Sequence, residues 1–281
     1  MTQPSFHRIG AAVPNSPVVI SVPHAGRHYP NALRAALRLQ PAALVGLEDR
    51  HVDAVAIAAR TDEAMLVQQL GRAWIDLNRS EEERDSRVDE GAVRAGSPSS
   101  TSAKLRSGLG LVPRRAGASD LWRRRFTDAD IVARIEGDYR PYHVALGEAL
   151  AAARARFGVA VLIDVHSMPP LERGGARVVI GDRFGQAAGA RFVSAMEAVT
   201  VAAGLRTALN TPYAGSHILH RHAAPAAGLH AIQLELDRSL YLDAALDRPG
   251  PGFDTTVGVL RHILAALAAE ALSATPALAA E

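Results

Sequence analysis

The sequence predicts an α/β protein, a sandwich in which helices cover a largely parallel β-sheet. Short apolar runs of strand-like composition alternate with segments of helical periodicity along the chain. With 281 residues the chain can bury a substantial core, and we expect a single domain spanning residues 1–281. Two of the strand-like runs end at a histidine, which places imidazoles at the sheet edge where α/β proteins build their sites.

The predicted elements follow from these patterns. Strands are expected at residues 17–23, 63–69, 72–77, 158–165, 176–181 and 229–236. Helices are expected at residues 31–39, 41–60, 128–156, 185–203 and 254–272. Pro41 suits the first turn of its helix and Asp128 can cap the third helix, whereas Pro141 should end or kink that third helix.

Residues 80–120 interrupt this alternation. An acidic run at 81–85 and a Ser-rich stretch at 96–102 have the composition of loops. Irregular connections of this length are usually functional lids or disordered excursions. Because the segment directly follows Asp76-Leu77-Asn78-Arg79, we expect a lid over a site. The Ala-rich tail from about residue 273 is expected to be frayed.

The composition excludes several classes of site. The chain contains no cysteine, which excludes disulfides, thiolate nucleophiles and Cys-based zinc sites. A metal ion must therefore be held by His, Asp and Glu, a donor set that suits a catalytic zinc or a similar divalent ion. No apolar stretch looks long and uninterrupted enough to span a bilayer, and the N-terminus lacks the pattern of a secretory signal. A cytoplasmic protein without a membrane partner is expected.

The basic residues do not indicate a nucleic-acid partner. The sequence pI is about 9.3, but the formal net charge is only +2. Lys104 is the only lysine among the 31 basic residues, a skew towards arginine that is typical of codon bias. The dense run Arg123-Arg124-Arg125 precedes a helical segment and is most simply a solvated face. No basic stripe or known binding module accompanies it, so we expect no nucleic-acid binding.

Two histidines predict a metal site. His24 and His166 each follow a buried strand-like run, and zinc hydrolases commonly draw ligands from several strand ends. Either histidine taken alone is more often a hydrogen-bonded structural residue. The third ligand should be a carboxylate, for which Asp49 is preferred and Glu48 or Asp53 are alternatives. The competing interpretation is that Asp49 caps the helix that follows it.

Two further segments carry charged side chains at strand-like positions. Arg79, with Asn78, could bind a substrate carboxylate bidentately, or it could form a surface ion pair with the glutamates at 81–83. Glu235 lies within an apolar strand, where a carboxylate is costly unless it has a partner or a chemical role. It would be a suitable general base beside a metal ion, or the partner of Arg238 in an ion pair.

Taken together, these segments form an ordered set of blocks between about residues 17 and 243. They are His24-Ala-Gly-Arg-His-Tyr29-Pro30, Glu48-Asp49 with Val52-Asp53, Asp76-Leu-Asn-Arg79, Tyr139-Arg-Pro-Tyr142-His143, Asp164-Val-His166-Ser-Met168-Pro169, Gly181-Asp182, Asn210-Thr-Pro-Tyr213-Ala-Gly215 and Gln233-Leu-Glu235 through Arg238 and Tyr241. In these blocks the chain resembles the N-formylglutamate amidohydrolase family. Each block alone is weak, but their common order is specific.

The resemblance implies a three-layer α/β/α domain with a mixed sheet, similar to zinc carboxypeptidases. It implies one Zn²⁺ held by His24, His166 and an acidic ligand near Asp49. One departure is Arg27, where carboxypeptidases place a glutamate three residues after their first histidine ligand. Another is Ala25, where many family members have serine. The acidic ligand must therefore come from elsewhere in the chain.

The resemblance also implies an activity, the metal-dependent hydrolysis of N-formylglutamate or a related small acidic N-acyl amino acid. Formate and the free amino acid would be the products. Glu235 is expected as general acid/base and Arg79 as the anchor for the substrate carboxylate. Asn78, Tyr213 and Arg238 are expected to complete the substrate pocket. The alternatives are a carboxypeptidase or deacylase acting on other N-acyl amino acids, and a non-catalytic small-molecule binding protein.

Overall fold

The computed structural model describes residues 5–93, 103–172 and 174–273. These residues group into two compact units. Unit 1 contains the described residues of segments 1–7, 23–48 and 68–144, and unit 2 those of 8–22, 49–67 and 145–281. The single domain over residues 1–281 stays a prediction. The Ser-rich stretch at 96–102 and the tail after residue 273 lie outside the described residues.

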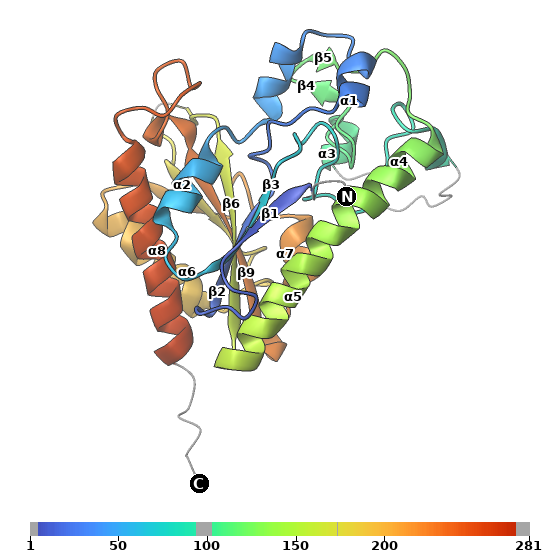
Figure 1. Cartoon of the computed structure of the whole chain (residues 1–281). Helices are drawn as coiled ribbons and strands as arrows, with labels where there is room; N and C mark the ends of the chain where they lie inside the picture. The colour runs from blue at the N-terminus through green and yellow to red at the C-terminus, as the bar shows by residue number, and fades with distance from the viewer. Residues whose placement is uncertain (1–4, 94–102, 173, 274–281) are drawn as a thin grey trace. The chain divides into compact units, whose positions relative to one another are not determined.

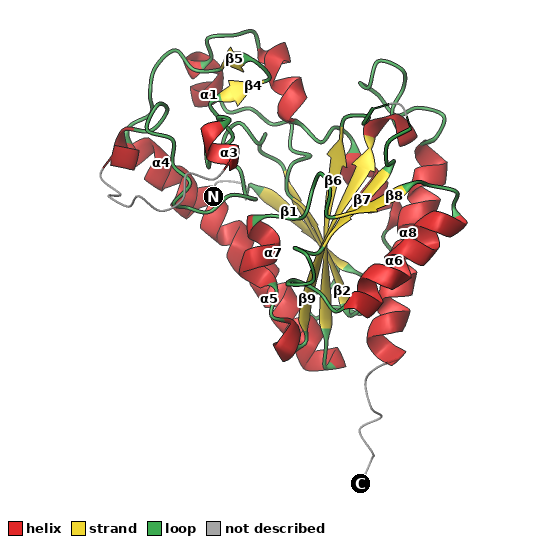
Figure 2. Ribbon diagram, turned by 180° about the vertical axis from the view of Figure 1, so that it is seen from behind, coloured by secondary structure: helices red, strands yellow, loops and turns green. Residues whose placement is uncertain are grey.

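The sheet has seven strands in the order β1-β3-β2-β6-β9-β7-β8. Figure 1 labels β1, β2, β3, β6 and β9, and Figure 2 also labels β7 and β8. These strands are β1 (Phe6–Ile9), β2 (Val18–Val22), β3 (Ala64–Gln68), β6 (Ala160–Met168), β7 (Val178–Gly181), β8 (Thr207–Leu209) and β9 (Leu229–Asp237). Strand β2 pairs in parallel with β3 and β6, and β6 pairs in parallel with β9. Strand β7 runs antiparallel to β9 and parallel to β8. The predicted mixed, largely parallel sheet is confirmed.

Helices of unit 2 cover the two faces of its sheet. Helices α2 (Val52–Ala59), α6 (Ala190–Ala202) and α8 (Phe253–Ser273) lie on one face, with α8 packed against α2, α6, β2 and β6. Helix α7 (His217–His222) packs on β9, and it lies on the other face with the C-terminal part of α5 (Arg140–Phe157) (Figure 2). This three-layer α/β/α arrangement is the predicted one. The parallel strands read as nearly continuous apolar runs because both of their faces are covered.

Helix α8 corrects one expectation from the sequence. Its 21 residues, with a mean hydropathy of 1.3 over an 18-residue window, are long and apolar enough to cross a membrane. Its apolar side chains are spaced as one face of a helix, and Val257, Leu260, Leu264 and Leu267 are buried. That face packs inside unit 2, which is the pattern of a core helix.

Unit 1 consists of short elements. They are α1 (Asn31–Ala36), 3₁₀ turns at Pro41–Leu47 and Glu90–Val93, α3 (Ala103–Arg106), a hairpin of β4 (Arg115–Ala116) and β5 (Ser119–Asp120), α4 (Asp128–Arg134), a π-turn at Ile135–Tyr139 and the first turn of α5. The region 80–120 therefore contains regular elements among its described residues. Its role as a lid stays a prediction.

Several predicted elements differ from the structure. Residues 72–77 form turns rather than a strand, because the Asp76 carboxylate accepts a hydrogen bond from the Asn78 amide within the same turn, 2.9 Å away. The helix expected at 41–60 is divided by residues 48–51, where His51 adopts a left-handed backbone conformation with φ 57°. Strands β1 and β8 and helix α7 were not predicted, since they are too short to show a clear periodicity.

The helix expected at 128–156 is present, but a π-turn at Ile135–Tyr139 interrupts it and ends two residues before Pro141. Proline has no N–H to donate to the preceding turn, and the wider turn accommodates this loss. Thr127, rather than Asp128, caps the start of α4 by accepting from the Asp130 amide in a capping box.

Candidate functional site

Polar side chains line one face of the sheet in unit 2, towards the carboxyl ends of three parallel strands. Ser21 on β2 is in register with Asp164 on β6, which is in register with Gln233 on β9. Two residues further along, His166 is in register with Glu235. Residues in register on parallel strands point to the same face, and so do residues two apart on one strand. The fold therefore gathers these five buried side chains on one surface.

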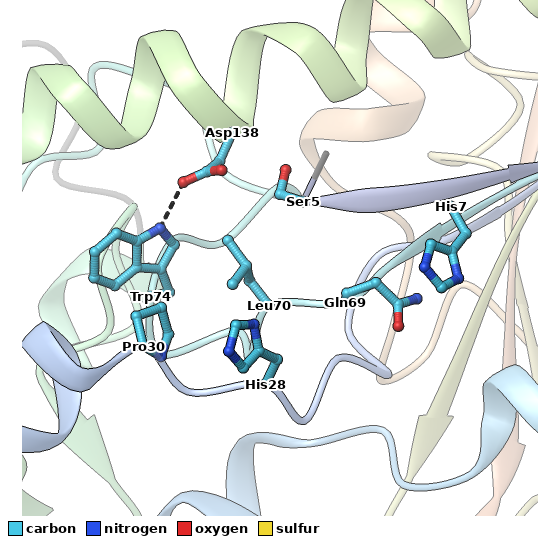
Figure 3. A pocket seen from close by; sticks show the side chains of 8 residues that line it. All are labelled: Ser5, His7, His28, Pro30, Gln69, Leu70, Trp74 and Asp138. Carbon is cyan, nitrogen blue, oxygen red and sulfur yellow. Dashed lines mark hydrogen bonds between the residues drawn. The ribbon is translucent and has the colours of Figure 1, made fainter. Parts of the chain in front are cut away.

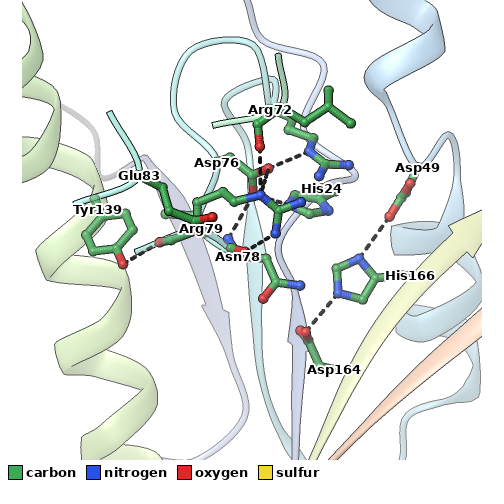
Figure 4. A network of polar contacts seen from close by, with 12 residues as sticks. His24, Asp49, Arg72, Asp76, Asn78, Arg79, Glu83, Tyr139, Asp164 and His166 are labelled. Atoms are coloured by element: carbon green, nitrogen blue, oxygen red, sulfur yellow. Dashed lines mark hydrogen bonds and ion pairs between the residues drawn. The ribbon is translucent and has the colours of Figure 1, made fainter. Parts of the chain in front are cut away.

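His166 is held between two carboxylates, as Figure 4 shows. Its Nδ1 lies 3.1 Å from Oδ2 of Asp49, and its Nε2 lies 2.8 Å from Oδ2 of Asp164. The Ser21 hydroxyl donates to the other Asp164 oxygen at 2.7 Å. All of these side chains are buried, so the imidazole has a fixed orientation.

The charge around His166 is strongly negative. Burial by itself lowers the pKa of His166, because it disfavours the charged imidazolium. The Asp164 carboxylate and its hydrogen bond act in the opposite direction, aided by Asp49 and Glu235, and the pKa of His166 is raised well above its usual value of 6.5. Such a concentration of carboxylates stabilises a cation at this position, whether a proton or a metal ion.

Asp49 owes its position to the break between the 3₁₀ turn and α2. The left-handed His51 turns the chain, and the Val52 amide donates to the Asp49 carbonyl at the start of α2. The Asp49 carboxylate is shared, since Oδ1 accepts from Nη2 of Arg238 at 3.3 Å while Oδ2 faces His166. The Arg238 Nε also donates to the Ser167 hydroxyl at 3.2 Å. Asp49 is thus fixed from both sides.

Glu235 lies beside His166 on the neighbouring strand and is 7% exposed. The Gln233 side-chain amide donates to its Oε1 at 3.0 Å. A nearly buried carboxylate next to a cation site has the position required of a general base. The ion pair described for Arg238 is with Asp49, whereas the sequence had allowed Glu235 as the partner of this arginine.

A second polar cluster lies in unit 1, around Asp76. His24 follows β2 by two residues and is 2% exposed, and its Nε2 lies 2.7 Å from Oδ1 of Asp76. The Arg72 Nε donates to Oδ2 of Asp76 at 2.7 Å. Burial by itself raises the pKa of Asp76, but Arg72, His24 and Arg79 outweigh it and lower this pKa well below 3.8. Asp76 is therefore a carboxylate throughout the physiological pH range.

Arg79 extends this cluster. The Arg79 Nε donates to the Leu109 carbonyl at 2.8 Å, and its Nη1 donates to the Asn78 carbonyl at 2.6 Å. The backbone carbonyl of Arg79 accepts from the Tyr139 hydroxyl at 2.7 Å. The guanidinium is 3.9 Å from Asp76 and nearly buried. Burial lowers the pKa of Arg79, and Asp76 opposes this shift. Glu83, one of the glutamates at 81–83, also acts on the charge of Arg79 and raises its pKa, but the arginine is buried rather than on the surface as the alternative interpretation expected.

The other predicted site residues lie as follows. Glu48 accepts a short hydrogen bond from the Tyr29 hydroxyl in unit 1. Asp53 lies in the first turn of α2. Tyr213 lies in the loop between β8 and α7, whose backbone passes close to Gly181 at the end of β7. Among the described residues, the buried group that could hold a metal ion consists of His24, Asp49 and His166. Glu48 and Asp53 are not part of this group.

Unit 1 also has a cavity of about 520 Å³ (Figure 3). Its lining includes Ser5, His7, His28, Gln69, Trp74 and Asp138, with the Trp74 indole donating to Asp138 at 2.7 Å. None of the predicted site residues lines it. We assign no role to this cavity.

The chain is similar to known proteins of one family. Residues 16–242 match the N-formylglutamate amidohydrolase family. The chain belongs to this family. It is 31% identical over 234 residues to an N-formylglutamate deformylase of Pseudomonas putida, covering 81% of this chain and 82% of that protein. An N-formylglutamate deformylase of Pseudomonas aeruginosa is 29% identical over 262 residues, covering 90% and 93%.

A crystal structure supports the same assignment. The N-formylglutamate amidohydrolase from Ralstonia eutropha JMP134 superposes with a TM-score of 0.86 at 30% identity, covering 96% of this chain and 99% of that one. A gene product of Agrobacterium tumefaciens, 21% identical with a TM-score of 0.60 and covering 96% and 95%, shares the fold. Family and relatives together indicate an amidohydrolase.

The sequence indicated Asp49 as the acidic group near the histidines, but it did not reveal the aspartates that face Nε2 of His24 and His166. Asp164 was available as a signal, because it lies two residues before His166 and alternation places both on one face of the strand. Asp76 gave no comparable signal. It is separated from His24 by 52 residues and follows a segment that reads as a strand.

Proposed function

We propose that this chain hydrolyses the amide bond of N-formylglutamate, or of a closely related small N-acyl amino acid, using one divalent metal ion. The observation that carries the proposal is the Asp49–His166 pair on the carboxyl side of β6, in a chain of this family. Water is consumed at the formyl carbon, the C–N bond breaks, and the products are formate and the amino acid with its amine protonated. The names of the relatives support N-formylglutamate as the substrate.

The side chains fit a zinc ion. Ligands about 2.1 Å from a tetrahedral ion lie about 3.4 Å apart. Nδ1 of His166 and Oδ2 of Asp49 are 3.1 Å apart, close to that value. The remaining nitrogen of His166 faces Asp164, as is usual for metal-bound histidines.

His24 supplies the third ligand in this proposal. It follows β2 by two residues, and β2 is the parallel neighbour of β6. Within the sheet, Ser21 near the end of β2 is in register with Asp164, two residues before His166. The donor set of two imidazoles and one carboxylate is that of catalytic zinc sites which leave a position open.

A bound ion supplies Lewis acidity, which activates the scissile amide and the attacking water. Glu235 accepts a proton from that water and donates a proton to the leaving amine. Gln233 holds the Glu235 carboxylate at Oε1 through its 3.0 Å hydrogen bond. Arg79, with Asn78, binds the substrate carboxylate and so fixes the position of the amide. Tyr213 and Arg238 complete the pocket, and Arg238 also orients Asp49.

Purified protein tests the proposal directly. It should contain about one equivalent of zinc, release formate from N-formyl-L-glutamate, lose this activity to a chelator and regain it with added zinc. A panel of formimino-, acetyl- and succinyl-amino acids separates a deformylase from a broader deacylase. Bound zinc without turnover of any substrate would indicate a binding protein. No zinc and no chelator effect would refute the metal-dependent mechanism.

A pair of histidine variants tests the site itself. We expect His166→Ala to abolish zinc binding and turnover while the chain still folds. The matched control is His230→Ala on the adjacent strand β9, whose Nδ1 accepts from the Gly189 amide at 3.2 Å and whose ring packs on Phe192. Both histidines are buried, so a general packing defect affects both variants. Full activity in His166→Ala would disprove the assignment.

A further inference from the structure

Each of the two proposed histidine ligands has a buried aspartate next to its Nε2 atom. Nε2 of His24 lies 2.7 Å from Oδ1 of Asp76, and Nε2 of His166 lies 2.8 Å from Oδ2 of Asp164. Both aspartate side chains are completely buried, with 0% exposure. Each pair lies within one of the two units, so the two observations are independent of each other.

The two aspartates are themselves fixed by donors. Asp164 accepts from the Ser21 hydroxyl at 2.7 Å through the oxygen that does not face His166. Asp76 accepts from the Arg72 Nε at 2.7 Å and from the Asn78 amide at 2.9 Å. These bonds keep each carboxylate turned towards its histidine.

The chemistry of the pairs defines the protonation of the rings. A carboxylate can only accept a hydrogen bond, and a neutral imidazole carries one N–H. In the neutral ring of His24, Nε2 therefore holds the proton and the lone pair lies on Nδ1. In His166 both nitrogens face a carboxylate, Asp164 at Nε2 and Asp49 at Nδ1, 3.1 Å away. A metal ion bound between Nδ1 and Asp49 would take the place of the proton on Nδ1 and leave the proton on Nε2.

We propose that Asp76 and Asp164 are positioning residues that fix the Nε2–H tautomer of His24 and His166, so that both histidines bind the metal ion through Nδ1. This inference rests on the metal site of the proposed function. Each aspartate also raises the basicity of the ring that it accepts from. Loss of such a partner typically weakens metal affinity about 10- to 100-fold.

Imidazole ¹⁵N NMR of the zinc-loaded protein tests the tautomers without any variant. Zinc is diamagnetic, and the ¹⁵N shifts and couplings distinguish a protonated nitrogen from a metal-bound one. We expect Nε2 to be protonated and Nδ1 to be metal-bound in both His24 and His166. Coordination through Nε2 in either ring would overturn the proposal for that pair.

Zinc affinity, measured by competition with a chelator, tests the effect of the aspartates. Asp76→Asn and Asp164→Asn should each bind zinc about 10- to 100-fold more weakly, since the amide accepts a weaker hydrogen bond than the carboxylate. Thermal unfolding of the zinc-free proteins separates this effect from a loss of stability.

The chain offers a matched control in each unit. Asp89 in unit 1 pairs with Arg84, and Asp237 in unit 2 pairs with Arg177. Both are 2% exposed, and their described hydrogen bonds involve no histidine. Asp89→Asn and Asp237→Asn should keep the native zinc affinity. An equal loss in these controls, or an unchanged affinity in Asp76→Asn and Asp164→Asn, would overturn the positioning role.

The outcomes separate this inference from the proposed function. A protein that deformylates its substrate with zinc bound through Nε2 retains the proposed function and refutes the positioning of the histidines. A protein that binds no zinc refutes both.

Discussion

Gly181 offers a test of the loop that carries Tyr213. It ends β7, and the loop between β8 and α7 passes directly over it. A Cβ added there would lie 2.6 Å from the Ala214 carbonyl carbon and 2.7 Å from the Tyr213 carbonyl oxygen. Because ordinary contacts begin at 3.4 Å, Gly181→Ala must displace the loop backbone by about 0.8 Å.

The expected cost is that of inserting one methyl group against backbone, about 1–3 kcal/mol of unfolding free energy. In a chain of this size this lowers Tm by roughly 2–10 °C. If Tyr213 lines the substrate pocket, its displacement also lowers kcat/KM, since a misplacement of about 1 Å can cost up to about 100-fold.

Denaturant unfolding and a formate-release assay measure the two effects separately. The control is Gly147→Ala in α5, where an added Cβ meets nothing within 4 Å. In a helix this change should stabilise the chain by up to about 1 kcal/mol and leave kcat/KM unchanged. Equal stability of Gly181→Ala and the native chain would refute the close packing. A destabilised Gly181→Ala with native kcat/KM would remove Tyr213 from the pocket.

Three further outcomes are expected. Arg79→Met should raise KM for acidic N-acyl amino acids with a smaller effect on kcat, and an unchanged KM would remove its role as anchor. Burial lowers the pKa of His222 to about 4, so the unfolded chain takes up this proton first and stability falls as pH decreases from 6.5 towards 4. Urea unfolding should show this contribution as a loss of roughly 2 kcal/mol between pH 7 and pH 4.5, and His222→Gln should lack it. Zinc at 100 times its Kd should stabilise the native chain by about 2.7 kcal/mol but not His166→Ala, as measured by unfolding with and without the metal.

The sequence predicted the central strands because their signal is local. A parallel strand covered on both faces is a continuous apolar run, so β2, β6 and β9 could be found without knowing what packs on them. The same rule produced the error at Trp74–Leu77. That apolar segment forms turns stabilised by the Asp76 carboxylate, and such polar contacts override a weak strand propensity.

The site was predictable to a similar extent. His24 and His166 follow apolar runs, and that placement alone indicated a function at the sheet edge. The pairing of Asp49 with Arg238 could not be predicted, since the two residues are 189 positions apart in the sequence and only the fold brings them together. The burial of Arg79 could not be predicted either, because its guanidinium donates to the carbonyl of Leu109, which is 30 residues away in the sequence.

Strand β6 is buried along all nine of its residues and is hydrogen-bonded to a parallel neighbour on each side. His166 and Asp164 therefore belong to the part of the sheet that should open last, as amide hydrogen exchange would report. A metal ion bound to His166 should therefore dissociate from the folded site, since local unfolding of β6 is too rare to release it quickly. The backbone hydrogen bonds that join β6 to β2 and β9 consequently both position the side chains of the site and protect this part of the sheet from unfolding.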